Sequence, residues 1–151
     1  MKKSPLNWLF SILISALFWV FIGIFLGRII SDNVELTVMS PDEWMLIYTI
    51  ITGVVAIIGI IFSLAWLISG NNNLPTIKDV IRRWNIYFTF SLIIAILFFL
   101  CLAYIYQSEG MNLWYYFVVF IIIMLLGPGS FWLSSFIFTP IQYENTVLGK
   151  R

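Results

Sequence analysis

The chain has 151 residues, of which 62% are apolar and only 10% are charged, and its mean hydropathy is +1.01. A soluble domain carries about 25% charged residues, so we expect lipid, rather than water, to surround most of this chain. Its eight basic and seven acidic residues give a net charge of +1 and are dispersed over termini and loops, which excludes a basic track for nucleic acid.

Histidine is absent and Cys101 is the single cysteine. The chain therefore lacks the most common general base and metal ligand, and no Ser/His or Cys/His catalytic constellation can form. The carboxylates lie in expected loops rather than inside apolar runs. We expect no enzymatic activity, no cofactor and no metal site, and we expect Cys101 to be a small buried apolar residue.

The first apolar run covers about residues 6–27 and follows Lys2 and Lys3. Its length of about 21 residues exceeds the apolar core of a signal peptide and, at about 1.5 Å per residue, matches a bilayer of about 30 Å. It is expected to be a transmembrane helix that carries the small residues Gly23 and Gly27.

A second run, about residues 44–68, follows Pro41-Asp42-Glu43, whose acidic residues favour the positive end of a helix. Gly53, Ala56 and Gly59 form a stripe of small residues along it. Small residues allow close approach of helices in lipid. This stripe and the Gly23/Gly27 pair are therefore predicted helix-packing positions, either between the two spans or against another protein.

The connector 71–84 contains the densest positive charge, from Lys78, Arg82 and Arg83. Apolar residues recur at three- and four-residue spacing from Ile77 to Trp84, which predicts a cytoplasmic interfacial helix over about residues 76–84. Near an anionic leaflet each basic side chain contributes about 1 kcal/mol. Two interpretations remain open: a docking site for a cytosolic partner, or an anchor on anionic lipid.

The third run covers about residues 84–106 and the fourth about 113–139. Gly127-Pro128-Gly129 interrupts the fourth, because proline removes a backbone donor and clashes with the preceding turn. The fourth run is expected either to bend there as one span or to divide into a span and a re-entrant half.

The orientation follows from the basic residues near the span ends. One side collects Lys2, Lys3, Lys78, Arg82, Arg83, Lys150 and Arg151. The opposite side holds Arg28, which is expected to pair with Asp32 four residues on or with another carboxylate of that side. We therefore expect both termini and the connector to lie in the cytoplasm. The protein itself is expected in the inner (plasma) membrane of the cell.

Aromatic residues near the expected span ends, among them Trp44, Tyr106 and Trp114, are predicted to form interfacial belts. Trp19, Trp66 and Trp132 lie deeper in the runs and are candidates for helix–helix contacts, and the alternative is that they face lipid.

The predicted fold is an all-α, integral membrane domain over residues 1–151, with four transmembrane helices in two hairpins. The predicted function is that of a non-catalytic subunit of a larger bacterial inner-membrane assembly, such as a secretion, conjugation or transporter complex. It would contact membrane lipids and other membrane subunits, and present residues 71–84 to a cytosolic partner. The alternative is a homo-oligomeric channel or small-solute facilitator, lined by Ser and Thr and gated near Pro128.

Overall fold

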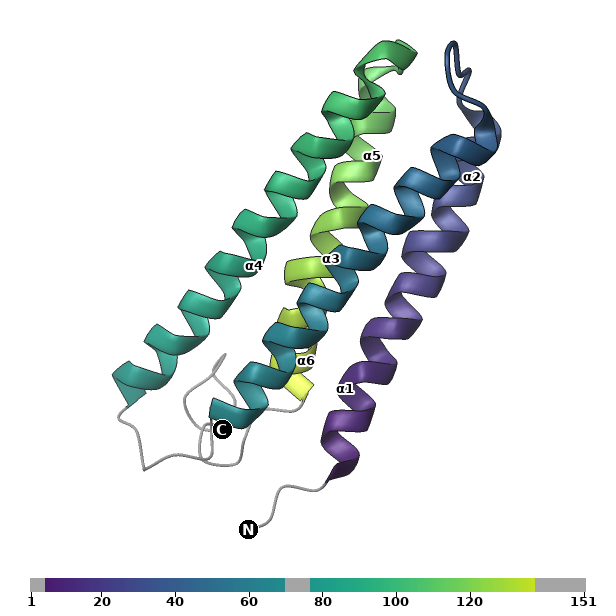
Figure 1. Ribbon diagram of the computed structural model, residues 1–151. Helices are drawn as coiled ribbons and strands as arrows, with labels where there is room; N and C mark the ends of the chain where they lie inside the picture. Colours follow the sequence, from purple (N-terminus) through teal and green to yellow (C-terminus); the bar gives the residue numbers. More distant parts are fainter. Residues whose placement is uncertain (1–4, 70–76, 138–151) are drawn as a thin grey trace.

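The structure, a computed structural model, describes residues 5–69 and 77–137, and these residues form four long helical rods (Figure 1). The first rod comprises α1 (Pro5–Phe18), the π-helical η1 (Trp19–Phe25) and α2 (Leu26–Asn33), and the second is α3 (Pro41–Ser69). The third is α4 (Ile77–Ile105), which ends in the 3₁₀ turn η2 (Tyr106–Glu109). The fourth comprises α5 (Leu113–Met124), the π-helical η3 (Leu125–Gly129) and α6 (Ser130–Ile137).

Four helices in the described residues are long and apolar enough to cross a membrane, over residues 9–33, 41–68, 78–109 and 113–135. The all-helical architecture and the four apolar segments predicted from the sequence are thus confirmed. The first rod continues to Asn33 rather than ending near residue 27, because residues 28–33 contain neither glycine nor proline to stop it.

The separate interfacial helix predicted over residues 76–84 is not present as such. α4 begins at Ile77 and runs without interruption to Ile105, so Lys78, Arg82 and Arg83 lie in the first two turns of the third rod. No glycine or proline occurs between residues 77 and 105, and the backbone hydrogen bonding of the helix therefore continues through Trp84. The preceding residues 71–76 lie outside the described part, as do Lys2, Lys3, Lys150 and Arg151.

Two helix starts are fixed by local side-chain contacts. The Ser40 hydroxyl accepts the amide of Glu43 at 3.3 Å, and a Glu43 carboxylate oxygen accepts the amide of Ser40 at 2.9 Å. This reciprocal pair satisfies amides that α3 cannot pair internally, and Pro41 in the first helical position needs no partner. At α5, Asn112 caps the helix by accepting the amide of Trp114.

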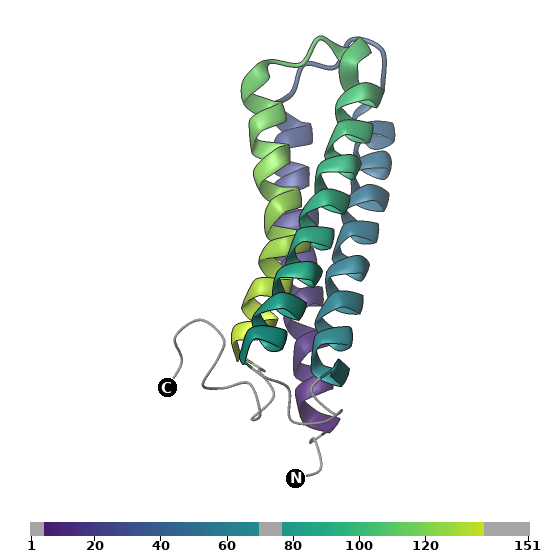
Figure 2. The ribbon, with the colours of Figure 1, turned by 90° about the vertical axis from the view of Figure 1, so that its left-hand side faces the viewer.

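The rods pack as a four-helix bundle in which α3 and the α5–α6 rod lie at the centre, with α1 and α4 on opposite flanks (Figures 1 and 2). Within the most apolar stretch of each rod, 50% of the residues are buried in the fourth rod, against 17% in the first and in the third. α1 begins and α6 ends at the same end of the bundle (Figure 1). The two short connections, after α2 and after η2, lie together at the other end, which we call the loop end.

Burial corrects several expectations for single side chains. Trp44 and Tyr106, predicted at a membrane interface, are 0% and 1% exposed. Trp66 is fully buried, as expected of a helix–helix contact, whereas Trp132 is 42% exposed. Cys101, predicted to be buried, is exposed on α4, because this residue lies on the outward face of a flanking helix.

Candidate functional site

The loop end is held together by the side chain of Glu109, the last residue of η2. One carboxylate oxygen, Oε2, accepts the amides of Thr37 at 2.9 Å and Val38 at 3.0 Å. The other, Oε1, accepts the amide of Met39 at 3.0 Å. Glu109 is only 1% exposed. Three successive amides around an anion form a backbone nest, so this carboxylate supplies acceptors to a segment that no helix pairs.

An aromatic stack lies beside this carboxylate. The ring of Trp44 stacks on Tyr48, with centroids 5.1 Å apart, and on Tyr106, with centroids 5.2 Å apart. The Tyr106 hydroxyl donates to the Trp44 carbonyl at 2.9 Å, and the Tyr116 hydroxyl donates to the Tyr106 carbonyl at 2.9 Å. The stacked rings and these two hydrogen bonds form a contact between α3, η2 and α5. The Tyr48 hydroxyl and the Trp44 indole N–H are buried without a hydrogen-bond partner among the described residues.

A polar hollow of about 400 Å³ lies beside the Glu109 carboxylate. Its walls include Glu35, Thr37, Glu109 and Tyr115, and the Tyr115 hydroxyl donates to the Asn33 carbonyl at 2.8 Å. Both carboxylate oxygens of Glu109 already accept loop amides, so its charge stabilises the loop. Within residues 5–69 and 77–137, no three His, Cys, Asp or Glu side chains lie close enough to hold a metal ion.

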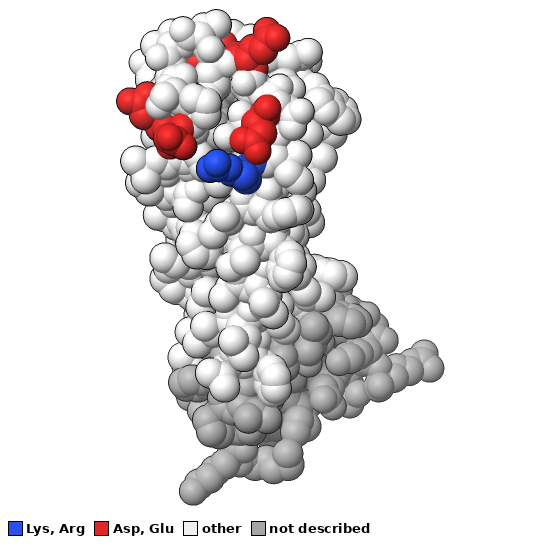
Figure 3. All heavy atoms as spheres, turned by 90° about the vertical axis from the view of Figure 1, so that its right-hand side faces the viewer, with Lys and Arg blue, Asp and Glu red and all other residues white. Residues whose placement is uncertain are grey.

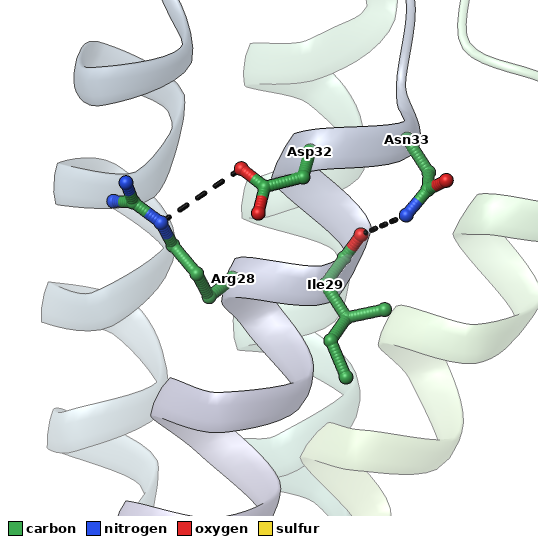
Figure 4. Close-up of polar contacts among 4 residues, drawn as sticks. All are labelled: Arg28, Ile29, Asp32 and Asn33. Carbon is green, nitrogen blue, oxygen red and sulfur yellow. Dashed lines mark hydrogen bonds and ion pairs between the residues drawn. The ribbon is translucent and has the colours of Figure 1, made fainter.

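Other acidic side chains gather at the same end of the bundle (Figure 3). The ion pair expected between Arg28 and Asp32 is confirmed, with Nε and Oδ1 3.8 Å apart (Figure 4). Both side chains are more than 60% exposed, so the pair stabilises the fold by less than about 1 kcal/mol. One residue further, the Asn33 side chain donates to the Ile29 carbonyl at 2.7 Å and satisfies a terminal carbonyl of α2.

The structure places the predicted helix-packing residues at contacts within the chain. A Cβ at Gly27 would overlap the ring of Tyr48, and one at Gly53 would lie 3.3 Å from Cζ2 of Trp19. Both contacts join the first rod to α3. A Cβ at Gly59 would lie 3.0 Å from the Leu126 carbonyl oxygen of the fourth rod, and Ala56 is buried.

Gly23 differs from these positions, because a Cβ there would meet mainly the side chain of Trp19, which belongs to the same rod.

The interior near the termini is lined by serines that bond within the bundle. Ser11 of α1 and Ser134 of α6 share a buried hydrogen bond of 2.6 Å between their hydroxyls. The indole of Trp84 in α4 donates to the Ser135 hydroxyl at 2.9 Å. These bonds join the fourth rod to both flanking rods.

The segment Gly127-Pro128-Gly129 lies in the π-helical η3. A π helix pairs each carbonyl with the amide five residues on, which suits a position where proline offers no amide to the carbonyl four residues before it. The Ser130 hydroxyl donates to the Leu126 carbonyl at 2.5 Å and also lies 3.0 Å from the Gly127 carbonyl. Gly127 lies against Val55 and Ala95, at the centre of the bundle.

The basic residues predicted either to dock a cytosolic partner or to bind anionic lipid are all exposed near the start of α4: Lys78, Arg82 and Arg83. Among the described residues, none of the three pairs with a carboxylate. They lie at the opposite end of the bundle from Glu109.

Sequence reasoning missed the role of Glu109, because the carboxylates were expected only to lie in loops and none was given a structural role at this end of the bundle. A signal was available. Glu109 precedes Gly110, whose positive φ of 63° ends the 3₁₀ turn, and a compact turn next to an aromatic-rich helix start can bury a side chain. Its partners, 70–72 residues away in sequence, could not be identified without the fold.

Comparisons of the chain with protein families, with curated proteins and with solved structures gave no match. The class of the protein is therefore taken from its fold. It is an all-helical protein with four helices that are long and apolar enough to span a membrane.

Proposed function

We propose that this protein is a non-catalytic, multi-pass subunit of a larger assembly in the bacterial inner membrane, such as a secretion, conjugation or transporter complex. Its four helices would cross the bilayer with both termini in the cytoplasm. The acidic loop end would then face outward and the basic start of α4 would face the cytosol, in accord with the positive-inside rule.

The observation that carries this proposal is that several interior polar side chains form hydrogen bonds within the chain. Glu109 is engaged by three backbone amides, Ser11 and Ser134 bond each other, and the Ser63 and Ser130 hydroxyls donate to carbonyls of their own rods. Such groups stabilise a scaffold, whereas a catalytic centre or coupled transporter needs reactive or ionisable groups that face a substrate.

The outer faces supply surface for partner helices. Along the first rod, Leu13, Leu17, Phe21 and Phe25 are 45–64% exposed. On the fourth rod, Trp114 and Phe117 are exposed and border an apolar hollow of about 680 Å³. The glycines of the first two rods already pack against side chains of the same protein. A partner would therefore pack against these larger side chains rather than against a small-residue stripe.

Photo-crosslinking in intact cells tests the proposal. A benzoylphenylalanine in place of Phe21 or Phe117 is expected to capture specific protein partners. The same probe at Phe131, which is 0% exposed, is the matched control and should capture none. Purification of the tagged chain in mild detergent as a lone monomer or homo-oligomer, with no adduct at either exposed position, would contradict the proposal.

The alternative, a homo-oligomeric channel, would need a pore lined by Ser and Thr. The buried hydroxyls of Ser11, Ser63 and Ser130 have partners within one chain, whereas those of Ser15 and Ser91 have none among the described residues. Flux of ions or small solutes through liposomes that contain the purified protein would favour this alternative.

A further inference from the structure

One outward stripe of α4 changes in character along its length. Its first residues, Lys78 and Arg82, are basic, and the polar Asn85 and Thr89 follow at intervals of one turn. Ile81 and Ile86 lie among these residues, and after Thr89 the stripe continues with Phe90 and Ile93. Together these side chains border a hollow of about 530 Å³, which is lined by Lys78, Ile81, Arg82, Asn85, Ile86, Thr89, Phe90 and Ile93.

These residues recur at spacings of three and four, so they occupy a single face of the helix. That face points away from the bundle: Ile81, Ile86, Phe90 and Ile93 are each 44–54% exposed. Arg83 is exposed as well but does not border the hollow. The basic residues of this end are therefore distinguishable by position.

We propose that this stripe, the α4 groove, binds one anionic phospholipid of the leaflet at the basic end. The phosphate would lie between Lys78 and Arg82, neither of which forms an ion pair with a carboxylate among the described residues. The amide of Asn85, one turn further in, faces the depth of the glycerol esters. Phe90 and Ile93 line the path of an acyl chain.

The length of the groove fits this occupant. From Arg82 to Ile93 the helix rises about 16 Å, at about 1.5 Å per residue. One leaflet contributes about 15 Å to a hydrocarbon core of about 30 Å. The distance from Arg82 to Ile93 along the helix therefore matches the distance from the headgroup of a single lipid to the end of its acyl chain.

A partner helix fits the groove less well. Helices associate in lipid through Gly, Ala, Ser and Thr, which permit close backbone contact, and Thr89 is the single such residue among the eight that border the hollow. Burying Lys78 and Arg82 under a second helix would also remove their hydration without a partner charge. An anionic lipid supplies the counter-charge and leaves both side chains at the interface.

The test is lipid retention by the full-length protein in mild detergent, measured by native mass spectrometry. The probe is an equal mixture of phosphatidylglycerol and phosphatidylcholine with identical acyl chains. The unaltered protein should retain phosphatidylglycerol preferentially. Lys78→Gln and Arg82→Gln should each lower that preference about fivefold, the equivalent of about 1 kcal/mol per basic group.

Arg83→Gln is the matched control, since it removes the same charge one residue away from the groove. It should lower the preference less than twofold. An equal effect of all three substitutions would show only general attraction to anionic lipid and would overturn the site. Displacement of the retained lipid by soluble glycerol phosphate would overturn it too, because the occupant would then be a free anion.

A second measurement avoids substitution of the basic residues. A photo-reactive side chain in place of Ile93, in cells, should form adducts with phospholipid; adducts with protein alone would assign the groove to a partner helix. The lipid site rests on the proposed membrane location but not on the proposed assembly. Crosslinking at Phe21 and Phe117 can therefore fail while lipid retention succeeds, and the reverse.

Discussion

The carboxylate of Glu109 accepts the backbone amide of Thr37 at 2.9 Å across 72 residues of sequence. This contact joins the connection of the first hairpin to that of the second. Because Oε1 and Oε2 together accept three successive amides, one side chain fixes the conformation of the longer connection between α2 and α3.

Replacement of Glu109 by alanine should destabilise the protein by about 1.5–3 kcal/mol, the magnitude of hydrogen bonds to a charged group. Glu109→Gln should cost less, since an amide oxygen can still accept from part of the nest. Denaturation in mixed micelles with rising SDS, followed by tryptophan fluorescence, measures the change. Glu35→Gln removes an exposed acid of the same loop end and should leave the midpoint unchanged; equal effects would refute a specific role for Glu109.

The glycines of the first two rods should differ in their tolerance of alanine. A methyl group at Gly27 overlaps the ring of Tyr48, whereas one at Gly53 lies 3.3 Å from Trp19 and requires only a small shift. Gly27→Ala should therefore cost about 1–3 kcal/mol, as overpacking does, and Gly53→Ala clearly less. The same unfolding assay checks the order, and a reversed order would contradict the packing described for these rods.

The hydroxyls of Ser11 and Ser134 should show a measurable coupling. A double-mutant cycle with Ser11→Ala and Ser134→Ala is expected to give about 0.6 kcal/mol, the average for polar pairs between helices in lipid. Ser15 offers a control, because it is buried on the same helix but its hydroxyl has no partner in the described part of the chain. A cycle that pairs Ser15→Ala with Ser134→Ala should give a coupling near zero.

The proposed orientation predicts opposite accessibility at the two ends of the bundle. In a variant with Cys101→Ser, a cysteine in place of Glu35 should react with an impermeant maleimide added outside intact cells. A cysteine in place of Arg83 should react only after the membrane is permeabilised. Both positions are exposed in the structure, so burial cannot account for a difference. Labelling of the Arg83 position from outside would invert the topology.

The amino-acid sequence by itself determined the class of fold. In lipid, a helix satisfies all backbone hydrogen bonds within its own segment. Apolar runs long enough to cross a bilayer, broken by short polar segments, therefore predict helices. The ion pair of Arg28 with Asp32 was also predictable, because residues four apart on a helix are neighbours. These features depend on local spacing, which a sequence displays directly.

The tertiary structure decided what each side chain faces. Trp44 is buried and Cys101 is exposed, contrary to expectation, because nearly uniform apolarity gives a helix no polar face by which its orientation can be read. The uninterrupted course of α4 turned predicted interfacial residues into the first turns of a long helix. The engagement of Glu109 by Thr37, Val38 and Met39 likewise arises only when the two hairpins pack together, since contacts between distant residues depend on the arrangement of the helices.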